Sequence, residues 1–497
     1  MELPEDIGSD FHQAKTTVIV SDLHLCEAEP LHPKYPLWKR YKSREFFFDK
    51  EFSQFLDHIQ EKSRGESIEL ILNGDIFDFD SVTSIPENPI FRLTWLERTR
   101  GLHPQEEKSK YKIDVILRDH KEWVDALRAF ILNGHRAIFI IGNHDLELHF
   151  RRVQESFLEH LNLPQDYTSQ VRFCEWFYIS NGDTLVEHGN QYDPYCMAQD
   201  PVHPYLLRFN RIEVRLPFGN LATRYMINSM GFFNPHVESN YIMSAGEYVR
   251  FFFRYMLRAQ PLIVATWIGS ATVILFQSFV DRLRPSLADP LTIEDRIENI
   301  AAKANAPPRV ARELKELFVA PAASYPTIIA RELWLDRAFL IFLVFFIVLE
   351  IFLLVNKVFG LSFFWIFIPL FMFLPFFLFY SKNVTSTVQQ YKEPKERILS
   401  AAALIAKVPR IIYGHTHIVR HEFIGAVEHL NSGTWSPAFL DVECEKRVGQ
   451  KSFVWISPGA EGEGRVAHLM AFENSDSYMV FNPKPRDSRK NRTLAKV

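Results

Sequence analysis

The chain has 497 residues, and its 56 Lys and Arg against 60 Asp and Glu give a formal net charge of −4. This balance excludes a generally basic nucleic-acid binder, so we expect no nucleic-acid partner. Hydrophobic residues make up 47% and charged residues 23% of the chain, which excludes a disordered protein and is typical of one large domain or two to three smaller ones. The four cysteines form no CxxC pair, which argues against a disulfide scaffold or a cysteine zinc site and favours a reducing compartment.

The first half of the chain alternates short apolar runs with helical stretches. From Thr16 to about Ala259, the runs TTVIVSD, IELILNGD, AIFIIGN and TLVEHGN are each typical of a buried strand that ends in polar residues. Between the second and third runs, KIDVILRDHKEWVDALRAFILNGH has the apolar spacing of helices. We therefore expect an α/β fold whose functional side chains cluster where the strands end.

Two later segments are apolar enough to cross a bilayer. Residues 338–355 are apolar apart from Glu350, and residues 359–380 contain no charge. At about 1.5 Å per residue, both can span a hydrocarbon core of roughly 30 Å. Because they adjoin, we expect a helical hairpin, with Pro369 and Pro375 kinking its second helix. A helix pair buried inside a soluble protein is the alternative.

A third apolar segment, residues 262–280, contains Gly, Ser, Thr and Gln, which weaken membrane insertion. Motifs on both sides of these segments must meet in one site, so the number of spans is even, and we expect this segment to be interfacial, re-entrant or buried. Lys and Arg flank the hairpin, whereas its tip offers only Lys357. Both ends of the hairpin are therefore expected to face the cytoplasm, as is the chain's start, which has no run typical of a signal peptide.

Five short strings carry metal-competent or acid/base side chains. They are SDLHL with Asp22 and His24, NGDIFD with Asp75 and Asp78, GNHD with Asn143, His144 and Asp145, EHGN with His188, and GHTH with His415 and His417. Oxygen and imidazole ligands without thiolate suit Mn, Fe or Zn. Two cations about 3.5–4 Å apart, bridged by one carboxylate, can hold a phosphate and generate hydroxide at neutral pH. One such string alone is more often a strand end with a turn, but all five together favour a two-metal phosphoesterase.

In this order the strings resemble the DxH, GDxxD, GNH(D/E), H and GHxH pattern of the calcineurin-like metallophosphoesterase superfamily. The resemblance covers about Thr16 to Asp193 and Ile411 to Trp435, with the membrane segments as an insertion. It implies an α/β fold of two mixed β-sheets packed face to face with helices outside. It also implies two divalent metal ions, with Mn expected first and Fe or Zn as alternatives.

The resemblance further implies a role for each residue of the motifs. One metal ion would be bound by Asp22, His24 and His417, the other by Asn143, His188 and His415, and both would be bridged by Asp75. His144 would contact the scissile phosphate and protonate the leaving oxygen, with Asp145 orienting its imidazole. Asp78 is expected to support the ligands. Asn190 and Asp193 either line the substrate site or form a turn.

Other residues allow two interpretations each, with Cys196 expected simply to pack. Six basic residues would either bind a second phosphate or lipid headgroups, or form a solvated surface. They are Lys39, Arg40, Lys42, Arg44, Arg151 and Arg152. Arginines 208, 211, 215 and 224 lie among bulky apolar residues, as in an interfacial helix or an ordinary packed amphipathic one. The basic tail, residues 484–496, either contacts anionic lipid or is solvated.

These features divide the chain into four parts: residues 1–259 and 381–497 as the two portions of a metallophosphoesterase domain, 260–337 as a helical or interfacial insertion, and 338–380 as the hairpin. Two helices expected within the insertion, TIEDRIENIAAKA and PRVARELKELF, would either cover the site or connect domains.

The leading hypothesis is a membrane-anchored phosphoesterase at the cytoplasmic surface, with membrane lipid as a partner. Its substrate would be a phosphodiester or diphosphate, and a lipid-linked substrate is one interpretation. UDP-2,3-diacylglucosamine pyrophosphatases are similar in acting on such a substrate, but they carry Arg where this chain has His144, so the resemblance does not assign the substrate. The alternatives are a soluble phosphodiester or phosphoprotein as substrate, with the hairpin only as an anchor, and a non-catalytic membrane scaffold.

Overall fold

The structure is a computed structural model that describes residues 13–208, 210–231, 253, 263–284, 290–383, 393–439, 441, 443–460 and 464–480. The basic tail named above lies outside these ranges, so its interpretation stays a prediction.

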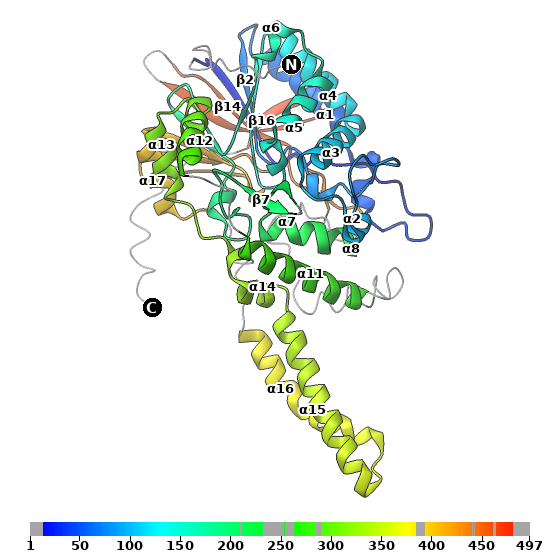
Figure 1. Ribbon diagram of the computed structural model, residues 1–497. Coiled ribbons are helices and arrows are strands. Elements are labelled where there is room, and N and C mark those ends of the chain that lie inside the picture. Colours follow the sequence, from blue (N-terminus) through cyan, green and yellow to red (C-terminus); the bar gives the residue numbers. More distant parts are fainter. Residues whose placement is uncertain are drawn as a thin grey trace.

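Two mixed β-sheets form the centre of the molecule (Figure 1). The seven-stranded sheet has the order β16 (Asp476–Met479), β15 (Arg465–Glu473), β14 (Ser452–Pro458), β1 (Thr16–Val20), β2 (Ile68–Asn73), β3 (Arg136–Ile140) and β4 (Val171–Cys174). The five-stranded sheet has the order β10 (Arg420–Ile424), β11 (Val427–Asn431), β9 (Arg410–Tyr413), β6 (Thr184–Glu187) and β5 (Phe177–Ser180). Strand β1 pairs parallel with β2 and antiparallel with β14, and β9 pairs parallel with β6 and β11. The expected fold class is confirmed.

The two sheets pack face to face over branched apolar side chains. Ile71 and Ile138 of the first sheet share one fully buried cluster with Val186 and Ile412 of the second. The other face of the first sheet is covered by α1 (Asp49–Lys62), α3 (Glu106–Asp119), α4 (Lys121–Leu132) and α5 (Arg151–Leu161). The other face of the second sheet is covered by α12 (Pro290–Lys303), α13 (Pro308–Lys315) and α17 (Glu396–Ala406). The result is a four-layered sandwich.

Helices α12 and α13 are the two helices expected between residues 281 and 337. Ile297 and Ile300 of α12 and Leu314 of α13 belong to the apolar cluster on the second sheet. These helices therefore complete the outer layer of the sandwich, which favours the alternative that they connect parts of the fold over the alternative that they cover the site.

A smaller helical group lies between the sandwich and the hairpin (Figure 1). It contains α7 (Phe218–Ala222), the π-helix η7 (Thr223–Ile227), α8 (Asn228–Met230), α11 (Ile263–Leu283), η9 (Ala322–Ser324) and α14 (Pro326–Glu332). Phe218 and Leu221 of α7 pack with Ala271 and Ile274 of α11 in one apolar cluster. This group connects the sandwich to the apolar helices below it.

The interfacial helix considered around arginines 208 to 224 is not what the structure shows. Two antiparallel strands, β7 (Tyr205–Arg208) and β8 (Arg211–Val214), precede α7. Arg208, Arg215 and Arg224 are buried, and Arg208 lies 2.7 Å from Asp281 of α11. Packing inside the protein is thus the interpretation that holds for these three arginines.

Two apolar helices, α15 (Leu335–Phe359) and α16 (Phe367–Asn383), project from the helical group (Figure 1). Among the described residues, Leu335–Phe359 and Phe363–Ser381 are the two helices long and apolar enough to cross a membrane, and only 6% of each apolar window is buried. The Tyr380 hydroxyl donates to Asp336 Oδ2 at 3.0 Å across the base of the pair. The helices form the expected hairpin, and their exposure contradicts the alternative of a buried helix pair. The chain turns at Gly360 and the short helix η10 (Phe363–Ile366).

Helix α11 covers the segment whose placement the sequence left open. It lies across the base of the hairpin (Figure 1). Its Ala271 and Ile274 are buried, whereas Ile268, Phe276 and Phe279 on its other side are exposed. The segment is thus half-buried, which contradicts the fully buried alternative.

The remaining short elements are η2 (Arg40–Lys42), η3 (Arg44–Phe46), η4 (Phe79–Ser81), α2 (Trp95–Arg100), η5 (Leu146–His149), α6 (Gln165–Thr168), η6 (Asn190–Tyr192), β12 (Ala438–Phe439) and β13 (Arg447–Val448).

Candidate metal centre

The predicted ligands lie just beyond strands of both sheets. Asp22 and His24 follow β1, Asp75 follows β2, Asn143 follows β3, His188 follows β6, and His415 and His417 follow β9. Parallel strands end at the same edge of a sheet, and backbone hydrogen bonds join these ends: Asp22 N donates to Gly74 O at 3.1 Å, and Gly414 N donates to His188 O at 3.0 Å. The fold therefore brings all seven residues to one edge of the sandwich.

The backbone at this edge is strained. Five of the predicted ligands have the left-handed backbone that non-glycine residues seldom adopt, with φ between 50° and 66°: Asp22, His24, Asp75, His415 and His417. Each such residue costs about 1–3 kcal/mol and persists only where the surrounding structure enforces it, commonly at functional sites. A Cβ on Gly142 would lie 2.3 Å from Asp75 Oδ1, so this loop also requires glycine for its close approach.

The first group of ligand atoms comes from Asp22, His24 and His417. These atoms lie within 4.8 Å of one another. His417 Nε2 is 3.1 Å from Asp22 Oδ1 and 3.2 Å from His24 Nε2. The Asp22 carbonyl accepts hydrogen bonds from the Thr434 hydroxyl at 2.8 Å and from Trp435 N at 3.2 Å. The segment after β11 thus holds Asp22 in place.

The second group comes from Asp75, His188 and His415, whose ligand atoms also lie within 4.8 Å of one another. His188 Nδ1 donates to the Asn73 carbonyl at 2.8 Å, and its Nε2 lies 3.1 Å from Asp75 Oδ2. A hydrogen bond of this kind fixes the imidazole tautomer and leaves the other nitrogen to act as a ligand. Asp75 also groups with His24 and His144, so it lies between the two groups, where a bridging carboxylate must be.

Asn143 contributes an amide beside this second group. His144 N, the next backbone donor, bonds to Asp75 Oδ1 at 2.8 Å. Asn143 Oδ1 is buried and accepts no hydrogen bond from any described residue. An unsatisfied buried acceptor costs about 1–3 kcal/mol, and a divalent cation would satisfy it. The donor set of carboxylate, imidazole and amide oxygen suits Mn, Fe or Zn, so the residues present fit a pair of divalent metal ions.

The electrostatics of the site also favour cations beside Asp75. Burial disfavours the Asp75 carboxylate, but His188, His144 and His24 outweigh it and hold its pKa well below the usual range. Burial likewise disfavours charged His188, yet the Asp75 carboxylate raises the pKa of His188 to about 9. The carboxylate thus relies on positive charge that imidazolium groups or metal ions can supply.

His144 contacts a different carboxylate from the one expected. Its Nδ1 lies 3.2 Å from Asp78 Oδ1, whereas Asp145 accepts the backbone N–H groups of Gly142 at 2.6 Å and Ile76 at 2.8 Å. Asp78 therefore has the orienting position expected for Asp145, which instead ties two loops together. Burial disfavours the charged imidazole, but Asp78 and Asp75 raise the pKa of His144 to about 10. Burial, together with the nearby Asp75 charge, raises the pKa of Asp145 to about 7.

The string after His188 contributes one contact to the centre. Asp193 Oδ2 lies 3.0 Å from His415 Nε2, whereas Asn190 begins η6 and its amide donates to the Cys196 carbonyl at 3.4 Å. Asp193 thus lies at the site, and Asn190 has the turn geometry that was its alternative.

Sequence reasoning missed several residues near the centre. Cys196 groups with Asp193 and His415 within 4.8 Å, and burial raises the pKa of its thiol well above the usual value. Asp80 accepts a hydrogen bond from Asn220 at 2.7 Å. Asp80 could have been found, because it is the third aspartate of the string NGDIFDFD. Cys196 and Asn220 are single residues without a motif, so nothing in the sequence indicated that they lie near the centre.

The basic residues considered as a phosphate grip mostly pair within the chain. Lys39 and Lys42 are buried and lie 2.6 and 2.7 Å from Glu29, so neither the phosphate grip nor the solvated surface describes them. Arg44 is exposed and pairs with Asp119 at 2.6 Å. Arg151 and Arg152 are also exposed and pair with Glu155 and Glu107.

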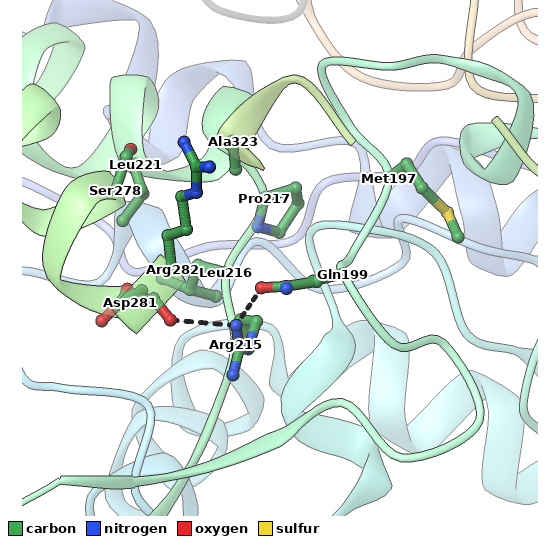
Figure 2. Close-up of a pocket in the computed structure, with 10 residues that line it drawn as sticks. All are labelled: Met197, Gln199, Arg215, Leu216, Pro217, Leu221, Ser278, Asp281, Arg282 and Ala323. Atoms are coloured by element: carbon green, nitrogen blue, oxygen red, sulfur yellow. Dashed lines mark hydrogen bonds between the residues drawn. The ribbon is translucent and has the colours of Figure 1, made fainter. Parts of the chain in front are cut away.

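A separate pocket lies between β8, α7 and α11, away from the predicted ligands (Figure 2). Arg215 reaches into it and donates to the Gln199 side chain and, at 3.0 Å, to the Asp281 carbonyl. None of its lining residues is a predicted ligand. These contacts secure α11 against the sandwich.

Comparison with known families supports the chemistry of this edge. Residues 15–213 match the family model described as calcineurin-like phosphoesterase, and no curated protein matches the chain. The match contains five of the seven predicted ligands, and the fold returns His415 and His417 to the same edge. Residues 15–213 therefore belong to a calcineurin-like phosphoesterase domain, the domain of the metallophosphoesterase superfamily, and the chain is a metal-dependent phosphoester hydrolase.

Proposed function

We propose that the chain is a two-metal phosphoesterase held at the cytoplasmic face of a membrane, where it hydrolyses a phosphodiester or diphosphate bond of a lipid-linked substrate. The observation that carries the chemistry is the pair of ligand groups on either side of Asp75. In this proposal one metal ion is held by Asp22, His24 and His417, the other by Asn143, His188 and His415, and Asp75 contacts both.

When bound, two divalent ions neutralise phosphate charge and supply an activated nucleophile at neutral pH. His144 acts beside them as the general acid. Its Nδ1 is engaged by Asp78, so Nε2 is the atom that gives a proton to the leaving oxygen. The Asp78 carboxylate beside Nδ1 favours the protonated form of this imidazole.

The membrane part of the proposal rests on the hairpin. Phe364 and Phe371 are 78% and 74% exposed, as are many apolar side chains along both helices. In water, these side chains would form an apolar patch far larger than those on the surfaces of soluble monomers. Arg331 precedes the hairpin, Arg337 lies at its base, and Lys357 is near its tip. More basic residues flank its two ends than its tip, which favours ends on the cytoplasmic side. Helix α11 lies across the base of the hairpin and exposes Ile268, Phe276 and Phe279, which fits contact with the same surface.

The test is substrate hydrolysis by full-length protein purified in detergent, measured as formation of the phosphomonoester products. Lipid diphosphates in mixed micelles are compared with soluble phosphodiesters, with Mn²⁺ or with a chelator. The control is Asp75→Asn, which keeps the volume of the side chain but removes the bridging charge. We expect metal-dependent turnover of the lipid substrates well above that of the soluble ones, and its loss in Asp75→Asn.

Other outcomes would change the proposal in defined ways. Turnover of soluble compounds alone would reduce the hairpin to an anchor. Metal binding without turnover of any substrate would favour a non-catalytic scaffold.

A further inference from the structure

A buried asparagine outside the matched family region contacts one of the predicted ligands. Asn220 lies on α7, beyond residues 15–213, and its side chain is fully buried. Its Nδ2 donates to the Asn143 carbonyl at 2.7 Å and to Asp80 Oδ2 at 2.7 Å. Its Oδ1 accepts from Asn143 Nδ2 at 3.4 Å. The two asparagines are therefore joined through both backbone and side chain.

These contacts fix which way the Asn143 amide points. A backbone carbonyl is an acceptor only, so the Asn143 carbonyl requires the Nδ2 of Asn220, and the same Nδ2 lies 2.7 Å from Asp80 Oδ2. The Oδ1 of Asn220 then faces Asn143 and requires its Nδ2. The Asn143 Oδ1, which accepts no hydrogen bond from a described residue, is thereby left as the free ligand atom. The side chains thus form a relay in which Asn143 Nδ2 donates to Asn220 Oδ1, and Asn220 Nδ2 donates to Asp80 Oδ2.

Asn220 is held by the helical group rather than by the sandwich. Its neighbours Phe218 and Leu221 belong to the apolar cluster that includes Ala271 and Ile274 of α11. Figure 1 shows α7 between the sandwich and α11. The segment that orients the amide thus packs on α11, the helix that lies across the base of the hairpin.

We propose that Asn220 is a positioning residue that turns the Asn143 amide so that its oxygen, and not its nitrogen, faces the second metal ion. The inference rests on the ligand assignment of the proposed function. Without Asn220, the amide would be free to flip and present a nitrogen that carries two hydrogens and cannot bind a cation. Residues that orient a ligand typically change metal affinity by about 10–100-fold when they are replaced.

The test is calorimetric titration of chelator-treated, full-length protein with Mn²⁺. Asn220→Leu has a similar volume and removes the relay, and Asn220→Ala is a second variant that adds no bulk. We expect either to weaken one of two Mn²⁺ sites by about 10–100-fold and the other by less than about threefold. The matched control is Asn228→Leu. Asn228 is also a buried asparagine of the same helical run, and it donates to the Asp80 carbonyl at 2.7 Å. We expect both sites to be retained in this variant.

A double variant separates positioning from a general structural effect. In Asn143→Asp, both carboxylate oxygens can bind a cation and no orientation is required. We therefore expect Asn220→Leu to change Mn²⁺ affinity by less than about threefold in that background. This inference alone would be overturned if Asn220→Leu also weakened Mn²⁺ binding in the Asn143→Asp background. It would likewise be overturned if Asn220→Leu left both Mn²⁺ sites of the otherwise wild-type protein unchanged. Wild-type protein that binds no Mn²⁺ would overturn the proposed metal centre and this inference with it.

Discussion

The sandwich and the hairpin are both rich in phenylalanine, and they place it in opposite environments. Phe52 and Phe55 of α1 are fully buried against Trp435, whereas Phe364 and Phe371 of the hairpin are 78% and 74% exposed. Burial of apolar surface is the main favourable term when a domain folds in water. Exposed apolar surface of this extent suits a helix whose surroundings are hydrocarbon. The difference supports the proposal that the sandwich lies in water and the hairpin in hydrocarbon.

The two regions also treat charge differently. In the sandwich, Lys42 is buried and pairs with Glu29 at 2.7 Å and Glu27 at 3.4 Å. In the hairpin, Asp336 and Arg337 lie at the base, while Glu350 lies within the apolar stretch of α15. Buried charge is tolerated where a partner is supplied, as Glu27 and Glu29 are for Lys42.

The largest effect is expected where the sandwich carries chemistry. His144→Ala should lower kcat by about 10²–10⁴-fold, because a general acid contributes that much. Mn²⁺ binding and the membrane-bound fraction should remain as in the wild type, since His144 is not one of the proposed ligands. Steady-state kinetics and calorimetry check this, and a kcat within threefold of wild type would remove His144 from the mechanism.

A matched pair of substitutions tests the contrast in phenylalanines directly. Phe55→Ala should lower the free energy of unfolding of the sandwich by about 3–5 kcal/mol, because it opens a cavity among packed aromatic rings. Phe371→Ala, at an exposed hairpin position, should change it by less than about 0.5 kcal/mol. Urea unfolding in detergent measures both. Equal losses would contradict the separation of the two regions.

A charge placed in the hairpin tests its solvent. Phe346 lies in α15 and is half exposed. Phe346→Arg should disfavour membrane insertion by about 3 kcal/mol, the typical cost of a charge at a helix centre, with Phe346→Leu as the neutral control. We expect less protein in the membrane fraction and unchanged turnover of a soluble phosphodiester. Full insertion of the Arg variant would argue against a spanning helix.

The buried ion cluster predicts a pH dependence of stability. Burial disfavours the Glu27 carboxylate, but Lys42 and hydrogen bonds from Ser84 and Thr83 outweigh it and lower its pKa to about 2. A lowered pKa stabilises the fold fully above the ordinary value of about 4.5, and this stabilisation is lost as the pH falls from there towards 2. Glu27→Gln should therefore reduce stability at pH 7 by on the order of 3 kcal/mol. The difference from wild type should shrink below about pH 4.5 in urea titrations, and a constant difference would contradict the assignment.

The sequence by itself determined the class of chemistry and the presence of two long apolar helices. Asp75 and His188 could be named as candidate ligands because their side chains can bind metal ions, and the resemblance of the ordered motifs to the superfamily implied the role of each. Apolar runs likewise predicted the strands β1, β2, β3 and β6, helical patterns predicted α12 and α13, and two long apolar segments predicted the hairpin. These patterns depend only on neighbours along the chain.

Only the tertiary structure decided which polar groups meet. Asp78 and not Asp145 contacts His144, because the backbone of each loop turns one carboxylate inward and the other onto neighbouring N–H groups. Asn220 reaches Asn143 although 77 residues separate them. Lys42 is buried beside Glu27 and Glu29 rather than at the surface. Local patterns encode residue type and period, whereas such pairings depend on how distant segments pack, which no local pattern contains.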